Sequence, residues 1–207
     1  MPTPFLPAAL RRTALPLRPF AALGLAAALA SAGASAQPVQ YTIDPHHTFP
    51  SFEADHMGIS VWRGKMNRSS GSVMFDKASG QGEVDVSINL DSIDFGQDKL
   101  NAWARGKEFF DTKKYPKARF QGRFDAVKDG TPTQLVGTLT LHGASRPMTL
   151  QITHMKCVPH PIVKRELCGA DANGTFQRDE FGLDAGKDWG FKMNVDLRIQ
   201  VEALAAQ

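Results

Sequence analysis

Residues 193–201 read Met-Asn-Val-Asp-Leu-Arg-Ile-Gln-Val, so apolar and polar side chains alternate along the whole stretch. Because successive side chains of a β-strand point to opposite faces of the sheet, this pattern predicts a strand with one buried and one solvated face. The same period of two recurs at residues 84–90, 120–124, 135–141 and 148–152. Strands that each bury one face imply one shared interior, and the content of that interior decides what the protein does.

Strand patterns continue along most of the chain, separated by glycine and aspartate residues that are typical of turns. The expected strands are residues 41–44, 52–56, 61–66, 72–75, 83–93, 119–127, 135–141, 148–156, 175–178 and 191–202. About eight to ten strands in one domain predict an all-β barrel or sandwich.

One segment, residues 97–110, departs from the strand pattern. Leu100, Trp103 and Ala104 fall at helical spacing, and Tyr115-Pro116 stops the pattern. We expect a short helix that either caps an open barrel end or packs on the outside of one sheet.

The N-terminus has the features of a secretory signal peptide. Arg11, Arg12 and Arg18 precede an apolar run at residues 20–30, and Ala34-Ser35-Ala36 is a small-residue cleavage site. The run is too short to span a bilayer, which takes roughly 20 residues. We therefore expect cleavage after Ala36, which leaves residues 37–207 as one exported, periplasmic domain without stable membrane insertion. The paired arginines also fit twin-arginine export, although the residues after them are a poor context.

Removing the signal peptide changes the charge of the protein. The chain has 24 Lys and Arg and 21 Asp and Glu residues, and all three basic residues of the leader are lost. The mature chain is therefore close to neutral. A neutral chain argues against nucleic acid or an anionic membrane surface as the main partner.

The two cysteines, Cys157 and Cys168, are expected to form a disulfide, because an exported chain meets an oxidising compartment. The competing interpretation is a metal site that adds His154 and His160. The spacing of these residues matches no structural zinc pattern.

Several short motifs resemble, in order, the signature of the YceI-like family. They are residues 41–47 (Tyr-Thr-Ile-Asp-Pro-His-His) with 56–64, 92–94 (Ser-Ile-Asp), 107–111 with 114–116, 137–143 (Gly-Thr-Leu-Thr-Leu-His-Gly), and Arg178 with Phe181-Gly182. The resemblance covers residues 41–203. It implies a lipocalin-like antiparallel β-barrel of about eight strands with a short capping helix. An elongated apolar cavity would hold a long-chain amphiphile, such as a polyisoprenoid, an isoprenoid quinone, or a fatty acid or amide.

The resemblance carries further expectations. It implies no catalytic activity, and family precedent points to a homodimer. The insert at residues 156–171 is similar to that of a subgroup with a cysteine pair, which agrees with a disulfide. Pro50 stands where the family has an aliphatic strand residue, so we expect the strand around Phe52 to be bulged or at an edge.

Strand parity and the helix face select candidates for the cavity lining. They are Phe52, Val86, Ile88, Trp103, Phe109, Phe110, Leu139, Val195 and Ile199. The alternative interpretation of each is a residue of a solid core.

A polar head group would need hydrogen-bond donors beside the opening. The candidates are His47, His56, Arg63 and Arg105, with Lys65 and Lys107 nearby. Each basic residue could instead be a solvated surface charge, and each histidine could belong to a structural network with Asp44 or Asp55. A zinc site formed by His46, His47 and His56 lacks a recognised ligand spacing, so we expect no metal.

The enzyme motifs of common hydrolases, metalloproteases and nucleotide-binding proteins are absent from the sequence. We therefore expect a non-enzymatic carrier that needs no cofactor, with a bound polyprenyl compound or quinone as its partner. The alternatives are a packed barrel whose outer surface binds another protein, and an enzyme that acts on the bound lipid.

Overall fold

The computed structural model describes residues 1–2 and 37–207, so the expected signal peptide lies outside the described residues. The strands are β1 (Val39–Ile43), β2 (Ser51–His56), β3 (Ser60–Met66), β4 (Ser69–Asp76), β5 (Gln81–Asn89), β6 (Ile93–Asp94), β7 (Lys117–Lys128), β8 (Thr131–Leu141), β9 (Ala144–Pro159), β10 (Glu166–Gln177) and β11 (Asn194–Ala205). The helices are α1 (Asp98–Arg105) and the 3₁₀ turns η1 (Leu90–Ser92), η2 (Arg178–Phe181) and η3 (Lys187–Trp189). None of the described helices is long and apolar enough to cross a membrane.

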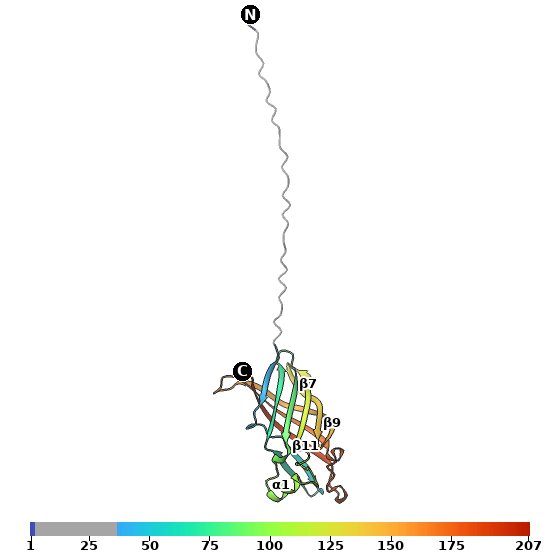
Figure 1. The fold of residues 1–207 in the computed structure, drawn as a ribbon. Coiled ribbons are helices and arrows are strands. Elements are labelled where there is room, and N and C mark those ends of the chain that lie inside the picture. Colours follow the sequence, from blue (N-terminus) through green and yellow to red (C-terminus); the bar gives the residue numbers. More distant parts are fainter. Residues whose placement is uncertain (3–36) are drawn as a thin grey trace. The chain divides into compact units, whose positions relative to one another are not determined.

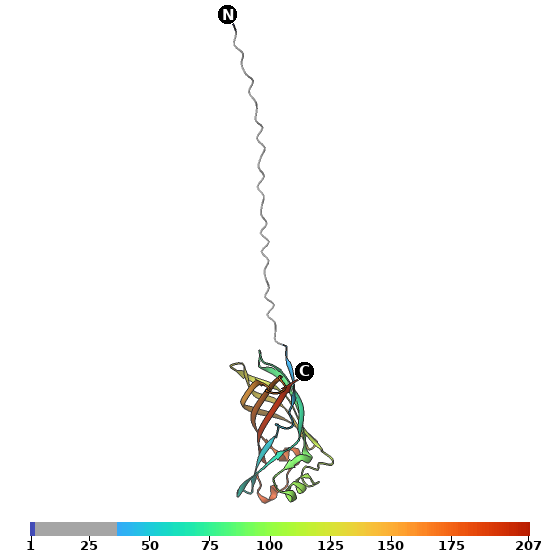
Figure 2. The same cartoon turned by 90° about the vertical axis from the view of Figure 1, so that its left-hand side faces the viewer.

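Eight strands close into an antiparallel barrel, which confirms the expected fold (Figure 1). The order around the barrel is β1, β4, β5, β7, β8, β9, β10 and β11, and Tyr41 of β1 pairs with Ala205 of β11 to close the ring. On the side of β11 that faces away from β10, the first half of the strand pairs with β2 rather than with β1, and Leu197 faces Phe52. Strands β2, β3 and β6 therefore extend the wall at the barrel end that carries α1 (Figures 1 and 2).

Two strand predictions were inaccurate. The stretch at residues 83–93 is not one strand, because the Asn89 side chain accepts a hydrogen bond from the Asp91 N–H and starts η1 between β5 and β6. Conversely, β10 is three times as long as the expected 175–178 segment. Small residues such as Ala170 and Ala172 occupy its inward positions, so the strand shows little apolar alternation.

The helix begins as expected and ends early. Gln97 caps α1 by accepting a hydrogen bond from the Leu100 N–H, and Gly106 ends the helix at Arg105 rather than at Phe110. The Asn101 side chain attaches α1 to the barrel by accepting from the Phe95 N–H. Because α1 lies at one barrel end and its Trp103 faces the interior cavity, the helix is a cap rather than an outer attachment (Figure 1).

The expectation for Pro50 was wrong. Strand β2 starts one residue later, at Ser51, and pairs with both β11 and β3 in an unbroken register. Pro50 still contributes its carbonyl, which accepts a hydrogen bond from the Met66 N–H at 2.9 Å. A proline just before a strand leaves the ladder intact, because its missing N–H falls outside the paired residues.

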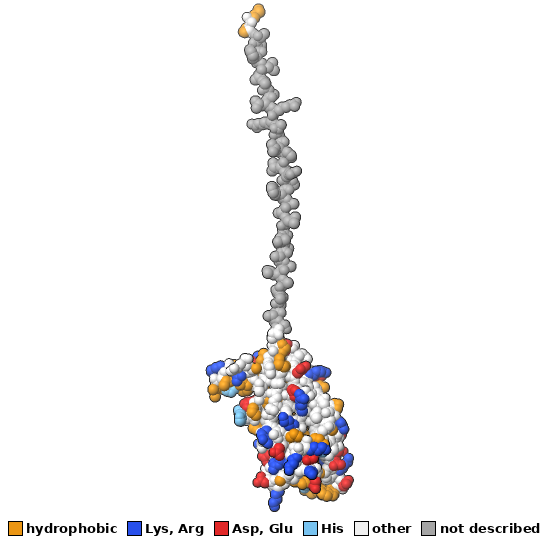
Figure 3. Space-filling model, in the orientation of Figure 1, with side chains coloured by type: hydrophobic (Ala, Val, Ile, Leu, Met, Phe, Trp, Pro, Cys, Tyr) orange, Lys and Arg blue, Asp and Glu red, His pale blue; other side chains and the backbone are white. Residues whose placement is uncertain are grey.

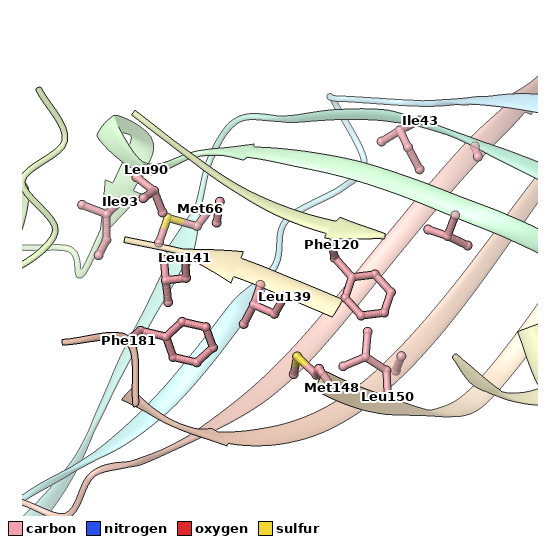
Figure 4. Packing of buried hydrophobic residues seen from close by; sticks show 14 of the residues in the cluster. Ile43, Met66, Leu90, Ile93, Phe120, Leu139, Leu141, Met148, Leu150 and Phe181 are labelled. Atoms are coloured by element: carbon pink, nitrogen blue, oxygen red, sulfur yellow. The ribbon is translucent and has the colours of Figure 1, made fainter. Parts of the chain in front are cut away.

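Buried apolar side chains from separate strands meet inside the barrel. Figure 4 shows Phe120, Leu139 and Met148 pointing from β7, β8 and β9 toward the same interior space. Phe75 and Phe124 add a ring pair with centroids 5.1 Å apart. The parity of the period-two stretches thus sets which face of each strand is inside.

Cys157 and Cys168 form the expected disulfide, between directly paired residues of β9 and β10. The oxidised sulfurs are unavailable as thiolate ligands, so the alternative metal site with His154 and His160 is excluded in this state.

Replacing both cysteines with serine is expected to lower the free energy of unfolding by about 2–3 kcal/mol, because the bridge closes a short loop in the unfolded chain. That corresponds to a fall in Tm of roughly 4–12 °C for a domain of this size. Calorimetry of oxidised protein and the double variant measures it. Equal melting temperatures would contradict a stabilising bridge.

Candidate functional site: an apolar cavity inside the barrel

Inward-facing side chains of the barrel surround a cavity of about 260 Å³, whose lining runs from Tyr41 to Trp103. Its lining is almost wholly aliphatic and aromatic, and among the described residues Asp55 and Arg178 are its only charged side chains. A space for one water-sized group takes roughly 10–15 Å³, so the cavity has room for roughly 20 such groups. An interior of this composition favours an apolar ligand of considerable length.

All nine residues predicted to line the cavity do so: Phe52, Val86, Ile88, Trp103, Phe109, Phe110, Leu139, Val195 and Ile199. Their contact with a ligand stays a prediction. Val86, Ile88 and Ile199 are only partly buried although their strands are paired on both sides. Inward side chains of a solid core would be fully buried, so their residual exposure agrees with an open interior.

The two ends of the cavity differ. At the α1 end, Trp103 is 40% exposed, and Trp62 and Phe191 are half-buried beside it in the lining. At the other end Tyr41 is only 1% exposed. These exposures place the opening at the end formed by α1, the β2–β3 hairpin and the segment after η3, which lie together in Figures 1 and 2.

A polar cluster holds Tyr41 at the closed end. The Tyr41 hydroxyl donates to Glu166 Oε1 at 2.5 Å, and Lys77 Nζ donates to Glu166 Oε2 at 2.5 Å. Burial, followed by the hydrogen bond to Glu166 and the charge of Glu166, raises the pKa of Tyr41 above its ordinary range. Burial opposes ionisation of Glu166, but the bonds from Lys77 and Tyr41 outweigh it and lower the pKa of Glu166.

The raised pKa of Tyr41 predicts a loss of stability in alkali. The native state keeps the hydroxyl protonated, whereas the unfolded state ionises it above about pH 10. This contribution is therefore complete below that pH and declines as the pH rises further. Urea unfolding between about pH 8 and 11 should show a steeper loss for the native sequence than for Tyr41→Phe. Parallel curves would show that Tyr41 contributes nothing to the pH dependence.

Arg178 is a charged residue of the cavity lining that the sequence analysis did not select as a site residue. Its side chain is buried at 6% exposure, and the guanidinium donates to the carbonyl oxygens of Leu183 and Ala185, to the latter at 2.8 Å. It also lies over the Phe109 ring, 5.8 Å from the centroid. Burial lowers the pKa of Arg178, and the charges of Asp179 and Asp184 partly offset this, but an arginine stays charged at neutral pH.

Within residues 37–207, no carboxylate lies at ion-pair distance from Arg178. The carboxylate of the neighbouring Asp179 forms an ion pair with Lys187 instead, with Oδ2 2.8 Å from Nζ. The only signal in the sequence was the place of Arg178 in a family motif, which does not reveal burial or missing partners. A buried cation with spare N–H donors is suited to a polar ligand group.

None of the four predicted head-group residues lines the cavity. His47 is exposed and bonds to Asp44 at 2.7 Å, which was the structural alternative, and this bond raises the pKa of His47. His56 is half-buried behind the lining, where it stacks on Trp62 with ring centroids 4.1 Å apart and meets the Phe191 ring edge-on at 4.9 Å. Both predicted arginines form ion pairs instead: Arg63 with Glu53 at 2.8 Å, and Arg105 with Asp91 at 3.9 Å. Lys65 and Lys107 also lie outside the lining.

Two groups of described side chains bring possible metal ligands within 4.8 Å of one another. One consists of Glu166 and the two disulfide cysteines, whose sulfurs are bonded to each other. The other joins the exposed His47 to the half-buried Asp44 and Glu202. His46 and His56 belong to neither group, so the three histidines considered from the sequence do not converge.

Comparisons with known proteins agree with this architecture. Protein YceI of Escherichia coli O6:H1 is 32% identical over 186 residues, covering 88% of this chain and 95% of that protein. The crystal structure of Burkholderia cenocepacia BcnA matches with a TM-score of 0.63 at 21% identity, covering 77% of this chain and 98% of that one. A polyisoprenoid-binding domain from Saccharophagus degradans matches with a TM-score of 0.60 at 18% identity, covering 81% and 99%. At these identities the two structures support the fold alone.

The family model described as YceI-like domain matches residues 41–203, which is nearly the whole barrel. The match covers all the strands that surround the cavity except the first and last residues of the barrel. The chain therefore belongs to the YceI-like family.

Proposed function

We propose that this protein binds one long-chain isoprenoid, either a polyprenyl compound or an isoprenoid quinone, inside the barrel and carries it through the periplasm. The observation that carries the proposal is the elongated cavity, whose wall is apolar from the exposed Trp103 to the buried Tyr41. The shared fold of a polyisoprenoid-binding domain from Saccharophagus degradans is consistent with this ligand class.

Burial of the ligand chain supplies the affinity. Each buried methylene contributes about 0.8 kcal/mol, so sixteen carbons contribute roughly 12 kcal/mol before losses. Association and ordering of the chain cost about 4–15 kcal/mol. Short ligands therefore gain nothing, and only a long chain that fills the cavity binds tightly.

Arg178 is the residue we assign to the polar group of the ligand. Two of its N–H groups hold Leu183 and Ala185, which fixes the guanidinium in place and leaves other donors free. A carbonyl, hydroxyl or phosphate oxygen accepts such donors.

The polar content of the cavity favours binding over catalysis. Asp55 has its carboxylate occupied by the N–H groups of Gly58 and Lys192. Thr48 donates to the Glu202 carbonyl. Neither is arranged with a partner as a nucleophile and base. A periplasmic location is supported by the disulfide, which persists in oxidising compartments, and by the leader sequence.

A chain-length series tests the proposal. Delipidated protein is titrated with isoprenoid quinones of increasing tail length, and quenching of tryptophan fluorescence reports binding, since Trp62 and Trp103 line the opening. We expect affinity to rise at least about tenfold with each added isoprene unit until the cavity is full. Absence of binding, or affinity independent of tail length, would overturn the proposal.

A further inference from the structure

The hairpin of β9 and β10 projects beyond the barrel wall, at the left of Figures 1 and 3. Strand β9 pairs with β8 only as far as Gln151, and from His154 onward it pairs only with β10. The Cys157–Cys168 bridge ties the two strands together within the projection. We call residues 154–165 the hairpin tip.

The hairpin tip exposes aliphatic side chains. Ile162 is 81% exposed, Val163 is 45% exposed and Val158 is 38% exposed. Pro159 and Pro161 beside them are exposed as well. Such side chains at the end of a rigid projection contribute nothing to the core, so their position suits contact with another apolar surface.

The hairpin tip is also cationic. It contains Lys156, Lys164 and Arg165 with no aspartate or glutamate, and within residues 37–207 none of the three forms an ion pair. The carboxylate that follows, Glu166, is already held by Lys77 and Tyr41. On the paired strand, Glu166 faces Pro159 and Asp171 faces His154.

We propose that the hairpin tip docks this protein peripherally on an anionic phospholipid surface. Exposed aliphatic side chains enter the boundary between head groups and acyl chains, while flanking Lys and Arg attract lipid phosphates. A second copy of the chain is a poorer partner, because pairing of two tips would bring their cations together and Lys156 lies on the unpaired edge.

This inference refines the expectation from net charge. A near-neutral mature chain is not steered to a membrane from a distance, but a cluster of cations acts within about 8–10 Å, the range of electrostatics at physiological salt. The contact is therefore local and salt-sensitive. It does not depend on the proposed cavity ligand, because no residue among Lys156, Ile162 and Lys164 lines the cavity.

Vesicle co-sedimentation of the full mature protein tests the docking. The probes are vesicles of phosphatidylcholine alone and vesicles with about one-third phosphatidylglycerol. We expect binding to the anionic vesicles only, weakened as salt rises from about 50 to about 500 mM. The variants Lys156→Glu/Lys164→Glu and Ile162→Ser/Val163→Ser should each lower the partition coefficient at least about tenfold.

The matched control is Lys113→Glu/Lys117→Glu, which makes the same charge change on exposed residues outside the hairpin tip. It should bind within about twofold of the native sequence. Equal binding to both vesicle types, or an equal loss in the control, would overturn the proposal. So would absence of vesicle binding, the result expected if the tip contacts an acidic protein instead. Quinone titration of the same variants shows independently whether the cavity still binds.

Discussion

Replacing Ile199 with tryptophan is expected to weaken ligand binding strongly and leave the barrel folded. Ile199 lines the cavity from β11, and its partner on β10 is the small residue Ala172. An indole at this position therefore has vacant volume to enter and occupies the space that the ligand chain needs. We expect quinone affinity to fall at least about tenfold, since several methylenes lose their site at about 0.8 kcal/mol each. Fluorescence titration and thermal melting measure the two effects on the same sample.

The control for this variant is Gln200→Trp, at the next position of β11, where the side chain is exposed. It adds the same ring outside the barrel and should change neither affinity nor Tm. In a solid core, Ile199→Trp would instead lower the free energy of unfolding by about 1–3 kcal/mol. That result would favour the alternative of a packed barrel that acts through its outer surface.

Replacing Arg178 with methionine is expected to weaken binding of ligands that have a polar group and to destabilise the fold. Methionine keeps much of the side-chain length but leaves the carbonyls of Leu183 and Ala185 without their donor. Each unsatisfied buried group costs about 1–3 kcal/mol, partly offset because a buried charge is removed. A lost hydrogen bond to a charged donor lowers affinity by about 10- to 100-fold.

Arg178→Lys separates the two roles. Lysine keeps the charge but lacks the fork that reaches both carbonyls, so it should lose part of the stability and retain part of the affinity. The decisive comparison uses a prenyl alcohol and the matching hydrocarbon. We expect Arg178→Met to affect only the alcohol. An equal loss for both ligands would assign Arg178 a purely structural role.

The sequence predicted the wall of the barrel well, because strand parity depends on local alternation alone. The strands around Phe120, Leu139 and Ile199 all place their apolar residues inside. The pattern failed at β10, where Ala170 and Ala172 face inward. Their small side chains hide the alternation in the sequence and widen the interior in the structure.

Whether the interior is hollow could not be predicted. The same alternation of inward and outward side chains is compatible with a filled core and with a cavity. Which of the two forms depends on whether the inward side chains together fill the volume inside the closed barrel. Charged residues posed a related problem. Arg63 and Arg178 look alike in the sequence, but only the fold shows that Glu53 pairs with the first, while the second is buried with no carboxylate of residues 37–207 at ion-pair distance. The net charge of the whole chain likewise does not reveal that Lys156, Lys164 and Arg165 lie close together in the hairpin tip.

Native mass spectrometry of the mature protein, purified from the periplasm of a bacterial host, tests the central claim most directly. The account predicts a non-covalent mass increment of one long-chain amphiphile, which is released unchanged on denaturation and is much less abundant in Ile199→Trp. If only the mass of the ligand-free chain is observed from every host, and incubation with quinone adds no increment, the claim that the barrel binds a lipid in its interior is contradicted.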